Sequence, residues 1–225
     1  MNKQKSNYRK LESGTIIGIN LNHEIGIIFA KVVDLREFSK IDLSTTFHFI
    51  IYPYNYITEK ISEFNISEFL KSEPLTGGIY VMDIEPVIKK GIWLKVGTSD
   101  LKNYEKIVPD FRSFSSNIFT VHKYERDADS WRYFENGRPL KWIPAEYEQV
   151  EHLENSTCLS HDIVEIRLSM EVLNRAGKEM KKFYDLNEWT ELAPYYNMLF
   201  TKRFNQVSDK LKCKARDRNT LPNNV

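Results

Sequence analysis

The amino-acid sequence predicts an α+β protein: a bent, mostly antiparallel β-sheet with a small, barrel-like N-terminal part, and helices in the C-terminal third. The first observation is that residues 13–21 and 27–35 are β-branched runs on either side of a glycine-containing turn, a pattern typical of a β-hairpin. The second is that strand-like segments recur soon afterwards, at 45–52, 78–84 and 93–97. The third is that the apolar pattern becomes helical after residue 145.

The size of the chain permits one large domain, or a domain with an appended subdomain. Its 225 residues are 41% hydrophobic and 13% aromatic, which is enough for a sizeable core. We expect a flexible polar lead-in over 1–11, the α+β domain over 12–176, a helical extension packed on it over 177–212, and a disordered tail over 213–225.

The middle of the chain continues the β pattern. Residues 45–56 alternate aromatic and aliphatic side chains, which indicates a strand covered on both faces, and a short helix is predicted within 58–71. A second β block includes 117–125 and a hairpin over 131–144. In that hairpin, Asn136-Gly137 suits the positive φ values of a tight type I′ turn, and the arm after Pro139 is expected to be an edge strand.

Three helices are predicted in the last third. Residues 145–154 contain helix formers with apolar positions on one side. Residues 158–177 fit both a strand and a helix by period, but their length, Ser160 as N-cap, and Gly177 as a stop favour the helix. A third helix is expected to begin near Pro194.

The composition argues against several kinds of protein. Lys+Arg number 32 against 31 Asp+Glu, so the net charge of +1 gives no strong field for nonspecific DNA binding. Cys158 and Cys213 lack metal-binding spacing, and the five histidines are scattered, so no metal or cofactor is expected. No signal peptide or apolar run of membrane-spanning length occurs, so we expect a cytoplasmic protein without a membrane partner.

Two short blocks of the sequence favour an enzyme. The residues GIY at 78–80 and LKVG at 94–97 resemble the opening of GIY-YIG endonucleases, which implies that Tyr80, Arg112, His122 and a glutamate such as Glu148 would act on a phosphodiester. Lys95 stands where that family has its second tyrosine, and the gap between the two blocks is longer than usual. A plain strand is the competing interpretation, because strands favour Ile and Tyr.

Charge and aromatic patterns suggest contact surfaces. Glu148, Glu151 and Glu154 recur every three residues on the predicted helix, which fits either a solvated face or an acidic surface for a basic partner. Trp131, Tyr133 and Trp142 surround the predicted turn, as interface anchors or as core.

Basic residues crowd the chain after Lys202, but without the interleaved aromatic residues of a stacking platform. Nucleic acid is therefore not the expected partner.

Several blocks, in order, resemble the immunity protein 26 family of bacterial polymorphic toxin systems. These blocks are Gly14 to Val33, the stretch 78–97 with Trp93, the pair Pro109 and Phe111, and 158–168 with Glu165 and Arg167. The resemblance implies a protein that binds a cognate toxin domain and occludes its active site without catalysis, cofactor or metal. If the toxin is a nuclease, we expect Glu148, Glu151, Glu154, Trp131 and Tyr133 to contact it.

Overall fold

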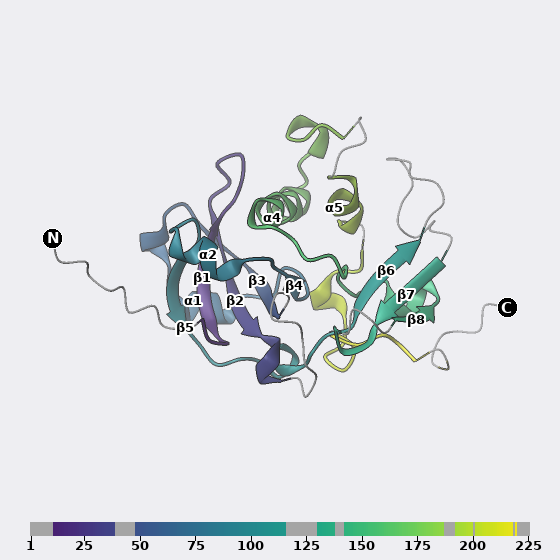
Figure 1. The fold of residues 1–225 in the computed structure, drawn as a ribbon. Coiled ribbons are helices and arrows are strands. Elements are labelled where there is room, and N and C mark those ends of the chain that lie inside the picture. Colours follow the sequence, from purple (N-terminus) through teal and green to yellow (C-terminus); the bar gives the residue numbers. More distant parts are fainter. Residues whose placement is uncertain are drawn as a thin grey trace.

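Two antiparallel sheets organise the protein, and this confirms the predicted α+β class (Figure 1). The structure is a computed structural model that describes residues 11–38, 48–115, 130–137, 142–186, 192–199, 201–217 and 219. Over these residues, one sheet has the strand order β4-β3-β2-β1-β5 and the other the order β6-β7-β8. The strands are β1 Thr15–Asn20, β2 Ile27–Asp34, β3 Phe49–Thr58, β4 Ile79–Tyr80, β5 Leu94–Thr98, β6 Phe111–Ser115, β7 Ser130–Phe134 and β8 Trp142–Ala145. The α-helices are α1 Ile66–Lys71, α2 Ile84–Lys89, α3 Tyr147–Val150, α4 His161–Arg175 and α5 Ala193–Met198.

The predicted N-terminal hairpin is confirmed. β1 and β2 pair antiparallel, with Asn20 opposite Ile27 at the end next to the turn. Gly18, in the middle of β1, is needed for packing rather than for the turn. A Cβ atom there would lie 2.5 Å from Cδ1 of Ile61, so a larger residue requires the end of the Ile61 side chain to move.

Both faces of the five-stranded sheet are covered. Alternate residues of each strand point to opposite faces, so Ile51 belongs to one apolar cluster and Ile50 and Tyr52 to the other. Val164 and Leu168 of α4 pack into the first cluster. The second cluster is completed by side chains from other parts of the chain, namely Phe69 of α1, Tyr104, Phe111, Phe204 and Cys213.

A charged pair is enclosed within the second cluster. The Lys31 Nζ lies 3.2 Å from Glu105 Oε2, and the two side chains are 1% and 0% exposed. Tyr54 donates its hydroxyl to Glu105 Oε1 at 2.5 Å, and the backbone N–H of Lys102 donates to Oε2 at 2.6 Å. The carboxylate therefore has the several partners that a buried charge requires.

The helix predictions have mixed outcomes. The helix predicted over 158–177 is confirmed as α4, which begins after the N-cap residue Ser160, and Gly177 lies just past its end with φ of +68°. The strand predicted over 78–84 was too long, because only Ile79–Tyr80 form β4 and α2 follows directly. Ile84 and Val87 of this short helix are buried in the first cluster, so tertiary packing stabilises a helix that local pattern does not reveal.

The second predicted hairpin is confirmed in its pairing but not in its turn. β7 and β8 are antiparallel, β8 is an edge strand among the described residues, and Asn136 and Gly137 have φ of +52° and +64°. Phe134 pairs with Trp142, so the connection spans 135–141 and is longer than a two-residue turn. Pro139 and the predicted strand 117–125 lie outside the described residues.

One short segment joins the two sheets. Leu159 donates its N–H to the Tyr80 carbonyl and accepts from the N–H of Met82, which extends the five-stranded sheet beyond β4. A few residues earlier, Arg112 of β6 donates its N–H to the Glu154 carbonyl and accepts from the N–H of Ser156. The segment 154–159 therefore pairs with an edge of both sheets.

The C-terminal part is more ordered than expected. Helix α5 begins near Pro194 as predicted, but it ends at Met198. Residues 213–217, expected to belong to a disordered tail, are anchored: Cys213 is 3% exposed, and Arg216 exchanges hydrogen bonds with Gln149. The polar composition of this segment hid these tertiary contacts. Over the described residues, no helix combines the length and apolarity needed to span a bilayer.

Candidate partner-binding face

The three-stranded sheet has one covered face and one face with exposed side chains. Cross-strand neighbours point to the same side, so Trp131 and Ala145 share a face, as do Tyr133 and Ile143. This face packs on α3, where Trp131 joins Val150 and Leu153 in a small apolar cluster. The opposite side carries Arg132, Phe134, Trp142 and Pro144, and we call these four residues the outer face. Phe111 of β6 lies opposite Phe134 on the same side, but it is buried against Tyr80.

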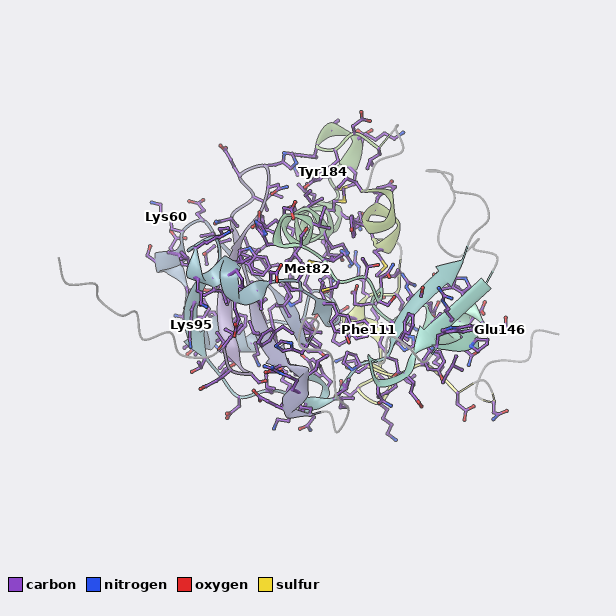
Figure 2. All side chains as sticks on the ribbon, viewed as in Figure 1. Lys60, Met82, Lys95, Phe111, Glu146 and Tyr184 are labelled. Carbon is purple, nitrogen blue, oxygen red and sulfur yellow. The ribbon has the colours of Figure 1, made fainter. Side chains whose placement is uncertain are left out.

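Trp142 is the most prominent side chain of the outer face. It is 52% exposed, the largest exposed fraction among the exposed large hydrophobic residues of the described chain. The Arg132 guanidinium lies over its ring, 5.3 Å from the ring centroid, and Pro144 beside it is exposed. Trp and Arg, held together here on two neighbouring strands, are among the residues most enriched at the energetic hot spots of protein interfaces. Figure 2 labels Phe111 at the side of this sheet near the five-stranded sheet and Glu146 at its far side.

The three glutamates predicted to form an acidic helix face do not share one. Helix α3 ends at Val150, so only Glu148 lies on it, and its side chain is exposed. Glu151 pairs with Arg216 at 3.0 Å. The Glu154 side chain is only 15% exposed and lies at the joint between the sheets. The prediction of a common face was wrong because it assumed that the helix continued to residue 154.

The two predicted aromatic anchors lie on the covered side. Trp131 is 7% exposed, its ring lies 5.0 Å from that of Tyr147, and Arg112 stacks on it at 5.4 Å. Trp131 is therefore a core residue, which is the second of the two alternatives that the sequence left open, and its burial argues against a role as a contact residue. Tyr133 is half-buried, and burial together with the negative charges of Asp110 and Glu135 raises the pKa of its hydroxyl.

The sequence pattern indicates Trp142 as a possible interface anchor but does not place it among the expected contact residues. The missing information was the register of the hairpin. Trp131 and Trp142 both lie on the hairpin arms, and only the pairing of Phe134 with Trp142 puts them on opposite faces. A tight two-residue turn at Asn136-Gly137, as the sequence suggested, gives a different register.

Glu154 sits among arginines at the joint between the sheets. Arg167 of α4 lies 3.9 Å from Glu154 Oε1 and 3.2 Å from Glu171 Oε2. Burial raises the pKa of Glu154, against the opposing effects of Arg167 and Arg112. The Glu154 carboxylate is thus a largely buried group beside Arg167 rather than part of an exposed acidic surface.

The residues considered for a nuclease lie in separate surroundings. The strand with GIY is β4 and the strand with LKVG is β5, and these strands lie at opposite edges of the five-stranded sheet. Tyr80 stacks on Phe111 and donates its hydroxyl to the Gly137 carbonyl, whereas Arg112 points to the other face of β6, toward Glu151. Glu148 is exposed on α3, and His122 lies outside the described residues.

The basic C-terminal residues also lie in different surroundings. Lys202, Arg203 and Lys210 are exposed, whereas Lys214 donates to Asp110 and to the Asn136 side chain. Among the described residues, no group of three or more His, Cys, Asp or Glu side chains is arranged to hold a metal ion.

Comparison with known proteins adds no relative: no family model, no curated protein and no solved structure matches this chain.

Proposed function

We propose that this protein is an immunity protein that binds a cognate toxin domain through the outer face of its three-stranded sheet and blocks the toxin's active site. One observation carries the proposal: Trp142 is 52% exposed on an edge strand, with Arg132 stacked on it. Exposing a tryptophan to water is unfavourable, and a partner that covers it gains the burial energy of a large aromatic ring.

The surroundings of Trp142 suit a protein partner. Pro144 next to it is rigid and exposed, and Phe134 opposite it is half-buried, so part of the outer face is already fixed in shape. A preformed surface of this kind loses little conformational entropy on binding. An interface centred here needs about 800 Å² from each partner.

Acidic residues lie close along the chain. Glu146 and Glu148 are exposed just after β8. At the rim of an interface such charges mainly speed the encounter with a basic surface, for example that of a nuclease toxin. Of the three glutamates expected to contact the toxin, only Glu148 is kept in this proposal, and Glu146 is added.

The proposal is tested by growth and binding. Cells expressing the C-terminal domain of a large secreted toxin encoded beside this protein are expected to grow only when this protein is co-expressed. Binding to a catalytically inactive toxin domain is then measured by calorimetry. Trp142→Ala is expected to weaken binding by about 30-fold or more, because a central tryptophan contributes about 2 kcal/mol or more.

Leu94→Ala is the matched control. Leu94 is also an exposed apolar residue, 43% exposed, but it lies on β5 at the far edge of the other sheet. Its truncation is expected to leave the affinity unchanged. If Leu94→Ala weakens binding and Trp142→Ala does not, the interface lies on the five-stranded sheet and the assignment of the outer face is wrong. Absence of growth rescue, with an active toxin, removes the immunity function for that pair.

A further inference from the structure

Two adjoining hollows lie at the joint between the sheets, next to α4 and α5. Figure 1 shows these helices beside each other above the joint. The larger hollow is about 120 Å³ and the smaller about 20 Å³. Both are lined by Glu154, Arg167 and Met198, so these side chains border the two hollows. The site lies apart from the outer face and does not depend on the proposed function.

The larger hollow has both apolar and polar walls. Ile79, Leu159 and Met198 supply the apolar part. Asn155 and Thr157 supply uncharged polar groups, and Thr157 is exposed, so it lies where the hollow reaches the surface. For scale, a dry apolar cavity of about 150 Å³ holds benzene. A ligand here has a similar number of heavy atoms, with one apolar part and one polar part.

Arg167 supplies the charge of the site. It is 3% exposed, yet it makes one hydrogen bond within the described part of the chain, from Nη1 to Glu171 Oε2 at 3.2 Å. Its Nη2 is 3.9 Å from Glu154 Oε1, which is too long for a hydrogen bond. A guanidinium has five N–H donors, and a buried one normally has most of them paired. The other N–H donors of Arg167 belong to a side chain that lines both hollows.

The charges around Arg167 are positive in sum. Arg175 pairs with Glu171 at 3.0 Å, and Arg112 acts on Glu154, so three guanidiniums share two carboxylates. Lys202 and Arg203, which line the smaller hollow, are exposed and add two more positive charges.

Two acidic groups on the neighbouring elements have partners of different kinds. Glu151 pairs with the cationic Arg216, whereas Glu73 accepts from the uncharged Asn205 side chain and keeps its negative charge. Even so, the local field favours an anion.

A buried acceptor adds to the polar character of the smaller hollow. His152, 5% exposed, has its Nε2 2.7 Å from the Lys214 carbonyl, which requires a proton on Nε2. Its Nδ1 is then an acceptor, and it has no hydrogen-bond partner in the described chain. Burial lowers the pKa of His152, which is consistent with a neutral ring.

We propose that the larger hollow binds a small organic anion, with a carboxylate or phosphate group on Arg167 and a short apolar body against Ile79, Leu159 and Met198. The planar guanidinium offers two parallel N–H groups, the geometry that recognises both kinds of anion. Lys202 and Arg203, beside the smaller hollow, attract the ligand.

The test uses the full chain and defined probes. Acetate, butyrate, benzoate and inorganic phosphate are each titrated against sodium chloride at matched ionic strength, with binding followed by calorimetry and by thermal unfolding. Saturable one-to-one binding is expected, with butyrate or benzoate binding more tightly than acetate because of the apolar walls. A preference for phosphate over acetate would assign the anionic group to phosphate, and the reverse to carboxylate. Absence of saturable binding by every probe overturns the proposal.

Two variants locate the binding. Thr157→Phe fills the larger hollow from its exposed edge and is expected to weaken binding by about tenfold or more. The double variant Lys202→Glu with Arg203→Glu is expected to weaken it by about 3- to 10-fold, as for reversed exposed charges. Lys90→Glu, an exposed charge reversal next to α2, is the control and is expected to have no effect. If Thr157→Phe binds as tightly as the unaltered protein, the anion binds elsewhere and the proposal fails. These variants keep Arg167, whose replacement would leave Glu171 without its partner.

Discussion

The two sheets of this protein differ in how their faces are covered. Each face of the five-stranded sheet carries a buried cluster, and even a lysine, Lys31, is enclosed there with Glu105. The three-stranded sheet has one such face, built around Trp131, while its outer face leaves Trp142 half in water. The first sheet is therefore a scaffold, and the second presents a surface.

The difference separates stability from recognition. Side chains of the five-stranded sheet and of the Trp131 cluster are expected to affect folding when changed. Side chains of the outer face are expected to affect binding and to leave folding almost unaltered. The following predictions test this division, from the largest expected effect to the smallest.

The largest loss of stability is expected from the enclosed ion pair. Glu105→Ala leaves Lys31 charged and unpaired inside the protein, and removal of one partner of a buried pair costs about 3–5 kcal/mol. Urea unfolding measures the change. The control is Glu68→Ala, which breaks the exposed pair with Lys71 and is expected to cost less than about 0.5 kcal/mol. Equal effects of the two variants would show that the Lys31–Glu105 pair is not enclosed.

The two tryptophans provide a direct comparison within one sheet. Trp131→Ala is expected to cost about 3 kcal/mol, because it empties the cluster under β7. Trp142→Ala is expected to cost less than about 1 kcal/mol, because its ring is already half exposed. Thermal and urea unfolding of both variants measure the difference. A reversed order would mean that the outer face, not the covered face, stabilises the sheet.

Two glycines test how closely the first sheet is packed. Gly18→Ala places a methyl group 2.5 Å from Ile61 Cδ1 and is expected to cost about 1–2 kcal/mol. Gly97→Ala, on the neighbouring strand β5, meets no atom closer than 3.9 Å and is expected to be nearly neutral. The two free energies of unfolding are compared under the same conditions. A costly Gly97→Ala would contradict the packing described for β5.

The smallest expected effect is a pH dependence at the joint. Burial raises the pKa of Glu154 in the folded protein, so its neutral form is favoured by folding. The contribution of Glu154 to stability is then fully present below its unfolded pKa and is lost as pH rises through the folded value. The stability of the unaltered protein minus that of Glu154→Gln is therefore expected to fall as pH rises from 4 to 8. An increase over this range would mean that the ion pair with Arg167 outweighs burial.

Local pattern was sufficient to predict the elements that have their own signals. The hairpin of β1 and β2 has β-branched runs around a turn, and α4 has an N-cap residue, Ser160, and a terminal glycine. The short helix α2 was missed because its stability comes from burial of Ile84 and Val87, which no local signal reports. The ordering of residues 213–217 was missed for the same reason, since their partners, such as Gln149, are distant in sequence.

The candidate site was predicted only in outline. The sequence drew attention to the aromatic residues around β7 and β8, but which tryptophan faces solvent depends on register, and register is a tertiary property. The three glutamates were grouped by a spacing of three, which has meaning only inside a helix. Because α3 stops at Val150, that spacing grouped Glu154 with residues of the helix surface, although Glu154 lies at the joint between the sheets, beside Arg167.

The segment that joins the sheets has a kinetic consequence. Leu159 forms a β-bridge with Val81, and Asn155 forms one with Arg112. Both bridges connect parts of the chain that are far apart in sequence. Closing such long loops is slow, and the closure is favourable only once the strands at both ends exist. The pairing of β1 with β5, which brings Thr15 next to Thr98, closes a loop of similar length inside the five-stranded sheet. Completion of that sheet and closure of the joint therefore both depend on contacts between distant parts of the chain, and such contacts are expected to make folding slow.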